Sequence, residues 1–309
     1  MTFQQLEYIV AVDTHRHFVN AATACGVTQS TLSTTIAKLE QEIDMVIFDR
    51  SKHPIEPTEV GKRIISQAKV ILHNSQQLRE MVRFEKETDG GELLIGIIPS
   101  ASSYLYPSMV KYMRQDCPKV HTTVTEDYAE VLIDKLQRAE LDMVILSNSE
   151  VKDTNLFEIE LYTERFVGYV SPASPLWNRE WLRPEDLQDG GIWAMRAFHD
   201  HYPQLAGITH RGNYHNTTLD HGNLHTLIQL VDTNGGYTIL PELFKKALSP
   251  EQQKNIRTIQ GPKFFRTMSL AIRTDYLRER MLNIVADAVK HAVPNEMFNQ
   301  RLLKFKITI

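Results

Sequence analysis

The sequence is poor in cysteine. Cys25 and Cys117 are the only two in 309 residues, and neither has a second thiol near it in the sequence. This argues against a disulfide scaffold and against a structural zinc site, because both need several cysteines at regular spacings. We therefore interpret both cysteines as small packing residues, and we expect neither a structural metal nor a cofactor.

Long apolar runs are also absent. No run approaches the roughly 18 consecutive apolar residues of a membrane helix, and the first residues are too polar for a signal peptide. We expect a cytoplasmic protein without membrane contact. With 42% hydrophobic and 23% charged residues, 14 glycines and 13 prolines, the chain is globular rather than disordered. The net charge of −4 means that any nucleic-acid-binding surface must be a local positive patch.

Three patterns follow one another along the chain. Residues 1–57 hold short helical patterns separated by polar turns, residues 58–89 one long helical pattern, and residues 90–309 alternating strands and helices. The predicted fold class is thus α/β with an all-α N-terminal part. Two lobes are expected in the last part: lobe I at about 90–165 and 268–309, lobe II at about 166–267. The alternation predicts parallel strands joined by crossover helices.

The N-terminal part predicts three helices. Thr2 and Gln5 form a capping box that starts the first. A second, at about Phe18 to Cys25, is rich in alanine. Thr28 caps a third, whose buried stripe is Leu32, Ile36, Leu39 and Ile43.

The other face of the third helix carries small polar side chains, which suit insertion into the major groove of DNA. Hydroxyl and amide groups can bond to base edges and phosphates without filling the groove. The alternative is a three-helix bundle with a merely solvated polar face. The predicted DNA contacts on this helix are Gln29, Ser30, Ser33, Thr34 and Lys38.

A turn-rich segment, Ser51 to Pro57, is predicted to form a wing. Arg50 and Lys52, together with Lys62 and Arg63, would supply the local positive patch. We predict that Arg50 and Lys52 contact DNA, although four scattered surface cations are the alternative.

The long helical pattern contains a heptad seam, which indicates a homodimer through this helix. A helix of thirty residues spans roughly 45 Å, more than a compact lone domain needs. Packing lengthwise on its own domain is the alternative. The seam residues are Ile64, Ala68, Ile71, Ser75, Leu78 and Val82.

A ligand site is predicted between the two lobes, at the carboxyl ends of the strands. Hydroxyls at the start of the first helix of this part, beside its free amides, would bind a small polar or anionic effector, and two histidines would close the site from lobe II. Ordinary loop and cap roles are the alternative. The predicted effector contacts are Ser100, Ser102, Ser103, Ser147, Asn148, His199 and His201.

Taken together, the sequence patterns of this chain resemble those of the LysR-type transcriptional regulators. The resemblance rests on Phe3-x-x-Leu6, Phe18-x-x-Ala21-Ala22, the run from Val27 to Glu40, Ile47-Phe48-x-Arg50 and Pro57-Thr58-Glu59-x-Gly61. It implies a winged helix-turn-helix, a linker-helix dimer that commonly assembles into a tetramer, and an effector domain like the type 2 periplasmic binding proteins. It also implies sequence-specific binding to promoter DNA and no enzymatic activity. Two positions depart from the family: Ser30, where proline is usual, and Glu56, near which a basic residue is usual.

The sequence as a whole is similar to those of the peroxide-sensing subgroup of this family, yet the pair of effector-domain cysteines typical of that subgroup is missing here. We therefore predict no intramolecular disulfide switch. Six histidines between residues 199 and 225 have spacings that metals can use, but as neutral hydrogen-bonding groups they suit a ligand cleft better. An enzyme is the rival interpretation, and no nucleophile elbow, phosphate loop or dinucleotide fingerprint supports it.

Overall fold

The computed structural model describes residues 1–84, 90–148, 155–187, 191–194, 223–261 and 264–308. The chain divides into two compact units. The first consists of Met1–Thr88 together with Asp134–Leu141 and Asp275–Leu277, and the second of the remaining residues. Among the described helices, none is long and apolar enough to span a bilayer.

The first unit begins with three short helices, α1 (Phe3–His15), α2 (Phe18–Ala24) and α3 (Gln29–Ile43). Both predicted N-caps are confirmed: Thr2 and Gln5 form a capping box on α1, and the Thr28 hydroxyl accepts from the amide of Thr31 at the start of α3. Leu32, Ile36 and Leu39 are fully buried, so the predicted stripe of α3 forms part of the core with α1 and α2.

A two-stranded wing follows α3. Strands β1 (Phe48–Asp49) and β2 (Glu56–Pro57) pair antiparallel, with Phe48 opposite Pro57. The amide of Ile55 donates to the carbonyl of Arg16 at 3.1 Å, which ties the wing to the end of α1.

The long helix α4 (Glu59–Phe84) starts against the segment before the wing. The Thr58 hydroxyl donates to the carbonyl of Val46 at 2.8 Å and accepts from the amide of Gly61 at 2.9 Å. A Cβ at residue 61 would lie 2.0 Å from the carbonyl oxygen of Ile47, so only glycine permits this approach.

The proposed heptad seam requires a correction. Ala68 is 1% exposed and Ile64 packs against the core of the first unit, so these two side chains are used within the chain itself. They lie against the helix-turn-helix because α1 packs along the start of α4. Ile71 and Leu78, further along, are exposed.

From residue 90 the chain alternates strands and helices, as predicted, and all of these elements belong to the second unit except the last residues of α6, from Asp134. The elements are β3 (Gly91–Ile97), α5 (Pro99–Asp116), β4 (Val120–Glu126), α6 (Ala129–Gln137) and β5 (Met143–Ser147). Strand β3 lies between β4 and β5 and runs parallel to both.

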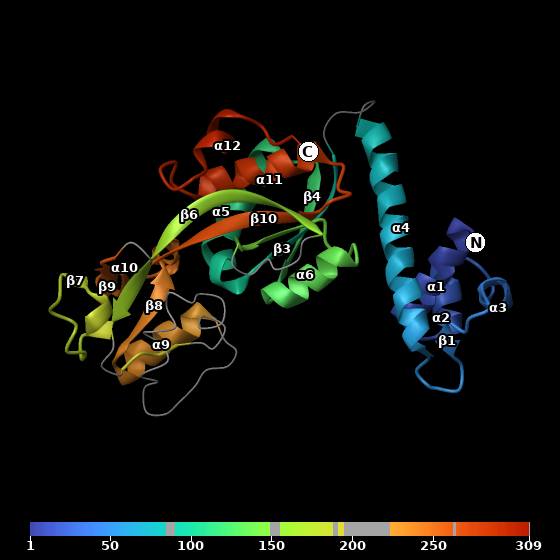
Figure 1. Ribbon diagram of the computed structural model, residues 1–309, viewed down its shortest axis with the longest axis horizontal. Helices are drawn as coiled ribbons and strands as arrows, with labels where there is room; N and C mark the ends of the chain where they lie inside the picture. Colours follow the sequence, from blue (N-terminus) through green and yellow to red (C-terminus); the bar gives the residue numbers. More distant parts are fainter. Residues whose placement is uncertain (85–89, 149–154, 188–190, 195–222, 262–263, 309) are drawn as a thin grey trace. The chain divides into compact units, whose positions relative to one another are not determined.

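Two long strands then cross between the lobes (Figure 1). Strand β6 (Leu156–Val170) pairs with β10 (Phe265–Arg273) over its first part and with β8 (Tyr237–Pro241) and β9 (Ile256–Ile259) over its last part. These pairings are antiparallel, as is β10 with β5. The expectation of parallel strands is thus confirmed for β3, β4 and β5 and wrong for β6 and β10. Strand β10 returns the chain from lobe II and therefore runs antiparallel to β6.

Smaller elements complete the unit: β7 (Trp181–Leu182), which runs parallel to β9, the 3-10 helices η2 (Pro184–Leu187) and η4 (Glu242–Ala247), and helices α9 (Leu224–Asn234), α10 (Pro250–Gln253), α11 (Glu279–Ala292) and α12 (Gln300–Lys304). Helix α11 packs on α5. Ile192 forms an isolated parallel bridge with Tyr237.

Candidate nucleic-acid interface and effector site

The polar face of α3 lies opposite its buried stripe. Gln29, Ser30, Thr34 and Lys38 are exposed and Ser33 is partly exposed. All five predicted contacts therefore lie on the surface of one helix, held by the burial of Leu32, Ile36 and Leu39 beneath.

Hydroxyl groups organise the first turn of α3. The Thr28 Oγ1 lies 3.0 Å from the Ser30 Oγ and 2.8 Å from the Thr31 Oγ1. With serine at position 30, where the family usually has proline, α3 starts at Gln29 with Thr28 as its N-cap.

The Glu40 side chain holds the segment that leads into the wing. Its Oε1 accepts from the amides of Ile47 at 2.7 Å and Phe48 at 3.2 Å, and its Oε2 accepts from the Arg50 guanidinium at 3.0 Å. The same guanidinium lies over the Phe18 ring, 5.4 Å from its centroid. Arg50 is therefore positioned by internal contacts and still has an exposed side chain, at 44%.

The wing carries an internal ion pair between Lys52 and Glu56, whose charged atoms lie 2.5 Å apart. The hydrogen bond from Lys52 lowers the pKa of Glu56, and the same bond raises the pKa of Lys52. The charge of Glu56 is thus balanced by Lys52, and Lys52 already has a carboxylate partner in the absence of a DNA phosphate.

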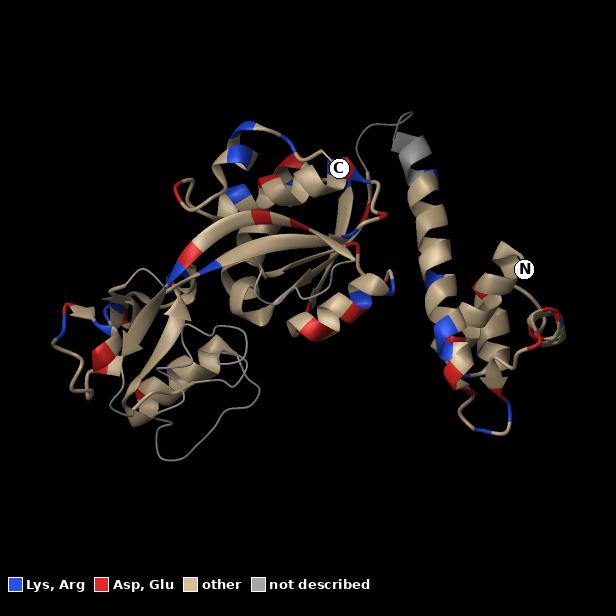
Figure 2. Cartoon of the chain, in the orientation of Figure 1, with Lys and Arg blue, Asp and Glu red and all other residues tan. Residues whose placement is uncertain are grey.

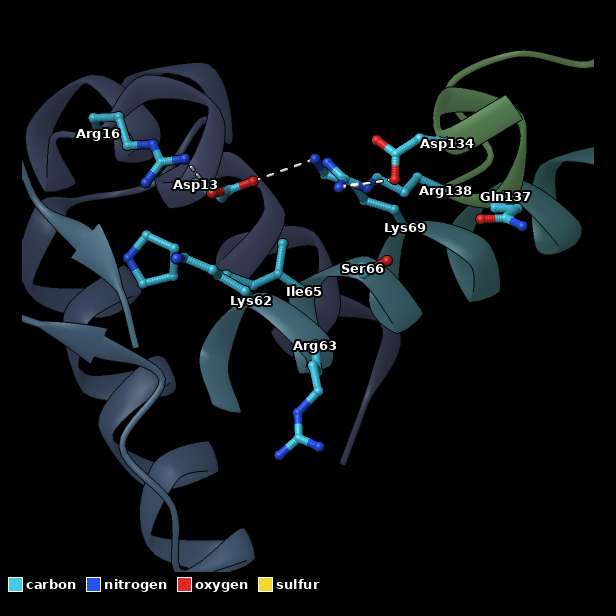
Figure 3. Close-up of a pocket in the computed structure, with 11 residues that line it drawn as sticks. Asp13, Arg16, Lys62, Arg63, Ile65, Ser66, Lys69, Asp134, Gln137 and Arg138 are labelled. Carbon is cyan, nitrogen blue, oxygen red and sulfur yellow. Dashed lines mark ion pairs between the residues drawn. The ribbon is translucent and has the colours of Figure 1, made fainter. Parts of the chain in front are cut away.

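Further cations lie along the wing and the start of α4 (Figure 2). Asp13 forms ion pairs with Arg16 at 2.8 Å and with Lys69 at 3.2 Å (Figure 3). Lys62 pairs with Glu59 at 2.6 Å, whereas Arg63 is exposed and has no ion pair within the described residues. Of the four residues of the predicted patch, Arg50, Lys52 and Lys62 each pair with a glutamate.

In the second unit, Ser100 lies in the first turn of α5, just beyond the carboxyl end of β3. Its Oγ accepts from Arg266 Nη1 at 2.7 Å, and its carbonyl oxygen accepts from Nη2 at 3.2 Å. Arg266 is on β10, so a strand that crosses between the lobes holds this predicted effector contact.

Arg266 belongs to a buried polar network. Its side chain and that of Glu164 on β6 are both 0% exposed, with 2.9 Å between their charged atoms. Glu164 Oε1 also accepts from the Tyr104 hydroxyl at 2.6 Å, and Oε2 accepts from the amide of Leu243 at 3.1 Å. Burial, reinforced by the Glu164 charge, raises the pKa of Tyr104 well above its usual range, so this phenol stays protonated and donates.

The other predicted effector contacts have different surroundings. Ser102 and Ser147 are buried, and Ser103 has a buried Oγ without a hydrogen-bond partner among the described residues. Asn148 is exposed. Ser100 follows β3, and Ser147 is the last residue of the neighbouring parallel strand β5, so both lie toward the same edge of the sheet. His199 and His201 lie outside the described residues, as does most of the histidine cluster.

Three residues of these sites were missed in the sequence: Glu40, Glu164 and Arg266. For Arg266 the available signal was a charged residue near the start of a mostly apolar strand run, β10. Glu164 gave no such signal, because β6 also carries Glu158, Glu160 and Arg165. The partnership of Glu164 and Arg266 was not visible, because they are 102 positions apart.

Neither cysteine has the surroundings of a reactive thiol. Cys25 packs against the core of the first unit, and burial followed by the charge of Glu7 raises its pKa. Burial and the charge of Asp116 likewise raise the pKa of Cys117. Because the thiolate is the reactive form, both shifts disfavour oxidation.

Known proteins resemble most of the length of this chain. The family model for the bacterial regulatory helix-turn-helix of the lysR family matches residues 3–62, and the model for the LysR substrate binding domain matches residues 86–294. The DNA-binding transcriptional dual regulator OxyR of Escherichia coli is 32% identical over 257 residues, which cover 82% of this chain and 83% of that protein. The hydrogen peroxide-inducible genes activator of Haemophilus influenzae is 30% identical over 94% of this chain and 98% of its own length.

A solved structure agrees. A full-length OxyR from Pseudomonas aeruginosa, carrying a single substitution, superposes with a TM-score of 0.81 at 27% identity, over 97% of this chain and 98% of that one. The expected similarity to the peroxide-sensing subgroup is confirmed, and the family is one of transcription regulators rather than enzymes. The chain therefore belongs to the LysR family, as a DNA-binding transcriptional regulator with an effector-binding domain.

Proposed function

We propose that this regulator reads promoter DNA through the exposed face of α3, with Gln29, Ser30 and Ser33 at the bases. The observation that carries the proposal is that α3 has two different faces. A fully buried apolar stripe fixes the helix, and short polar side chains lie on the exposed face. Such a helix can enter the major groove without steric hindrance. Lys38, Thr34, Arg50 and Lys52 are the further proposed contacts.

Ser33→Glu tests this proposal. The carboxylate would lie against phosphates and base acceptors, so we expect the salt-dependent footprint on promoter DNA to be lost. Gln260→Glu, which adds the same charge at an exposed position of the second unit, is the matched control and should keep the footprint. An unchanged footprint with Ser33→Glu would contradict the assignment of α3.

We further propose a homodimer through α4, with tetramers built from such dimers. Ile71, 38% exposed, and Leu78, 52% exposed, are apolar side chains on one stripe of a solvent-facing helix. A second copy of this helix offers the matching apolar surface.

For the effector we propose a small polar or anionic molecule at the edge of the sheet where β3 and β5 end. Ser100, Ser102, Ser103, Ser147 and Asn148 would bind it, and His199 and His201 would close the site. Arg266 donates to both oxygens of Ser100, which leaves the Ser100 hydroxyl proton free to point at a ligand. A ligand that bridges the lobes would shift their arrangement and thereby the spacing of the DNA-reading helices.

The chemistry of the proposed response differs from a thiol switch. No cysteine occurs between residue 118 and the last residue, so the effector domain has no pair of thiols that could form a disulfide within itself. The proposed signal is reversible ligand binding.

A further inference from the structure

The two strands that join the lobes have two chemically different faces. In the register of β6 with β10, Glu164 lies opposite Arg266, and Arg165 lies opposite Phe265. Successive side chains of a strand point to opposite faces. Glu164 and Arg266 therefore form the buried ion pair beside Ser100, whereas Arg165 and Phe265 are exposed on the other face.

A cavity of about 520 Å³ opens on this second face. Its volume is in the range of small-molecule sites, roughly 300–1,000 Å³. Phe265 is 48% exposed there, so apolar ring surface is available to a ligand. The cavity is lined by Thr163, Glu164, Arg165, Glu242, Ile259, Gly261, Phe264, Phe265, Glu296 and Met297.

Opposite charges line this cavity without pairing with one another. Arg165 and Glu296 are exposed, and neither forms an ion pair within the described part of the chain. Glu242 pairs with Lys245, its neighbour along η4, at 3.3 Å. The cavity thus offers a guanidinium, two accessible carboxylates and an apolar wall of two phenylalanines, Ile259 and Met297.

We propose that this cavity binds a free α-amino acid with an apolar side chain. Arg165 would bind the carboxylate, because a guanidinium donates two parallel hydrogen bonds to it. Glu296 and Glu242 would accept from the ammonium group, and Phe264 and Phe265 would pack against the side chain. A molecule with a single charge would satisfy only one side of the cavity.

Ligand binding in this cavity can be coupled to the response of the regulator to its effector. Arg165, on the cavity face of β6, directly follows Glu164, whose buried side chain bonds to Arg266, Tyr104 and the amide of Leu243. A ligand seated there contacts both strands that join the lobes, so its binding changes the free energy of the arrangement that the effector selects. This consequence rests on the proposed function, whereas the binding itself does not.

Calorimetric titration of the full-length protein tests the binding. The probe is L-phenylalanine, compared with 2-phenylethylamine, which lacks the carboxylate, 3-phenylpropionate, which lacks the ammonium group, and glycine, which lacks the side chain. We expect saturable binding of one phenylalanine per chain and at least about tenfold weaker binding of each comparison compound, because each loses a charge-assisted bond or the apolar contact. No binding of phenylalanine at millimolar concentration, or equal binding of the amine, would overturn the proposal.

Variants locate the site. Arg165→Met and Glu296→Gln should each weaken phenylalanine binding at least about tenfold, while Arg301→Met and Glu185→Gln, at other exposed positions of the same unit, should not. Wild-type affinity in the first two variants would place the ligand elsewhere and overturn the proposal. The promoter footprint of the unliganded protein is recorded in parallel, since its loss would count against the proposed function and not against this site.

Discussion

At the scale of single residues, the pair of Glu164 and Arg266 stands out because both side chains are fully buried. Two charges removed from water are tolerated only when their geometry and additional hydrogen bonds are good. Here the carboxylate accepts from a guanidinium, a phenol and a backbone amide, and the guanidinium also donates to both oxygens of Ser100. The pair therefore positions Ser100 as well as the two strands.

Glu164→Gln should expose this dependence. The amide keeps the shape of the side chain but leaves Arg266 as an uncompensated buried charge, so we expect the free energy of unfolding to fall by about 3–5 kcal/mol. Urea denaturation of the variant against wild type measures the change. Glu185→Gln, at an exposed position, should shift stability by less than about 0.5 kcal/mol. The double substitution Glu164→Leu with Arg266→Met removes both charges and should recover most of the loss; equal stability of Glu164→Gln and wild type would contradict the role of the pair.

At the scale of elements, local signals in the sequence predicted the helices well and the strands only in part. The capping residues Thr2 and Thr28 and the buried stripe of α3 lie within a few positions of the structure that they specify, so a short window reveals them. The full length of β6 is not visible in a local pattern, since its first ten residues mix exposed and buried side chains and lack a continuous hydrophobic run. Its antiparallel partner β10 is about a hundred positions away, and no local pattern fixes the direction of such a pairing.

Helix α4 also shows what a local sequence pattern can and cannot predict. The heptad spacing correctly indicated a long amphipathic helix, yet it could not tell which turns pack on α1. The structure assigns Ile64 and Ala68 to the core of the first unit, and leaves Ile71 and Leu78 exposed. The dimer contact proposed for this helix therefore depends on its second half.

Leu78→Lys tests that contact. The side chain is 52% exposed in the single chain, so the substitution should leave the fold intact. It would place a charge in the apolar seam between two copies, and we expect the assembly to dissociate to smaller species at micromolar concentration. Sedimentation velocity measures the state. Gln76→Lys adds the same charge on the opposite side of α4 and should leave the assembly unchanged; a variant at position 78 that sediments like wild type would remove the dimer from this surface.

At the scale of the whole molecule, the chain is similar to OxyR proteins in fold and has two cysteines, one in each unit. Similarity to those proteins extends over most of its length, whereas its two cysteines lie at residues 25 and 117. The sequence was sufficient to predict the regulator class and to place Ser100 after the strand β3, whereas Ser147, expected after a strand, is the last residue of β5. The hydrogen-bond network that holds Ser100 could not be predicted from the sequence, because it joins side chains and backbone from four separate elements, α5, β6, β10 and η4.

The double variant Cys25→Ser with Cys117→Ser tests whether any thiol takes part in the response. Burial raises the pKa of both thiols, so the thiolate fraction at neutral pH is below that of an ordinary cysteine, and oxidation by peroxide is correspondingly slow. We expect wild type and variant to give the same promoter footprint before and after micromolar hydrogen peroxide. Mass spectrometry of the treated wild-type protein should show both cysteines reduced. A footprint that changes with peroxide in the wild type and not in the variant would mean that this regulator senses oxidants through a thiol despite its effector domain, and that the response is not ligand binding alone.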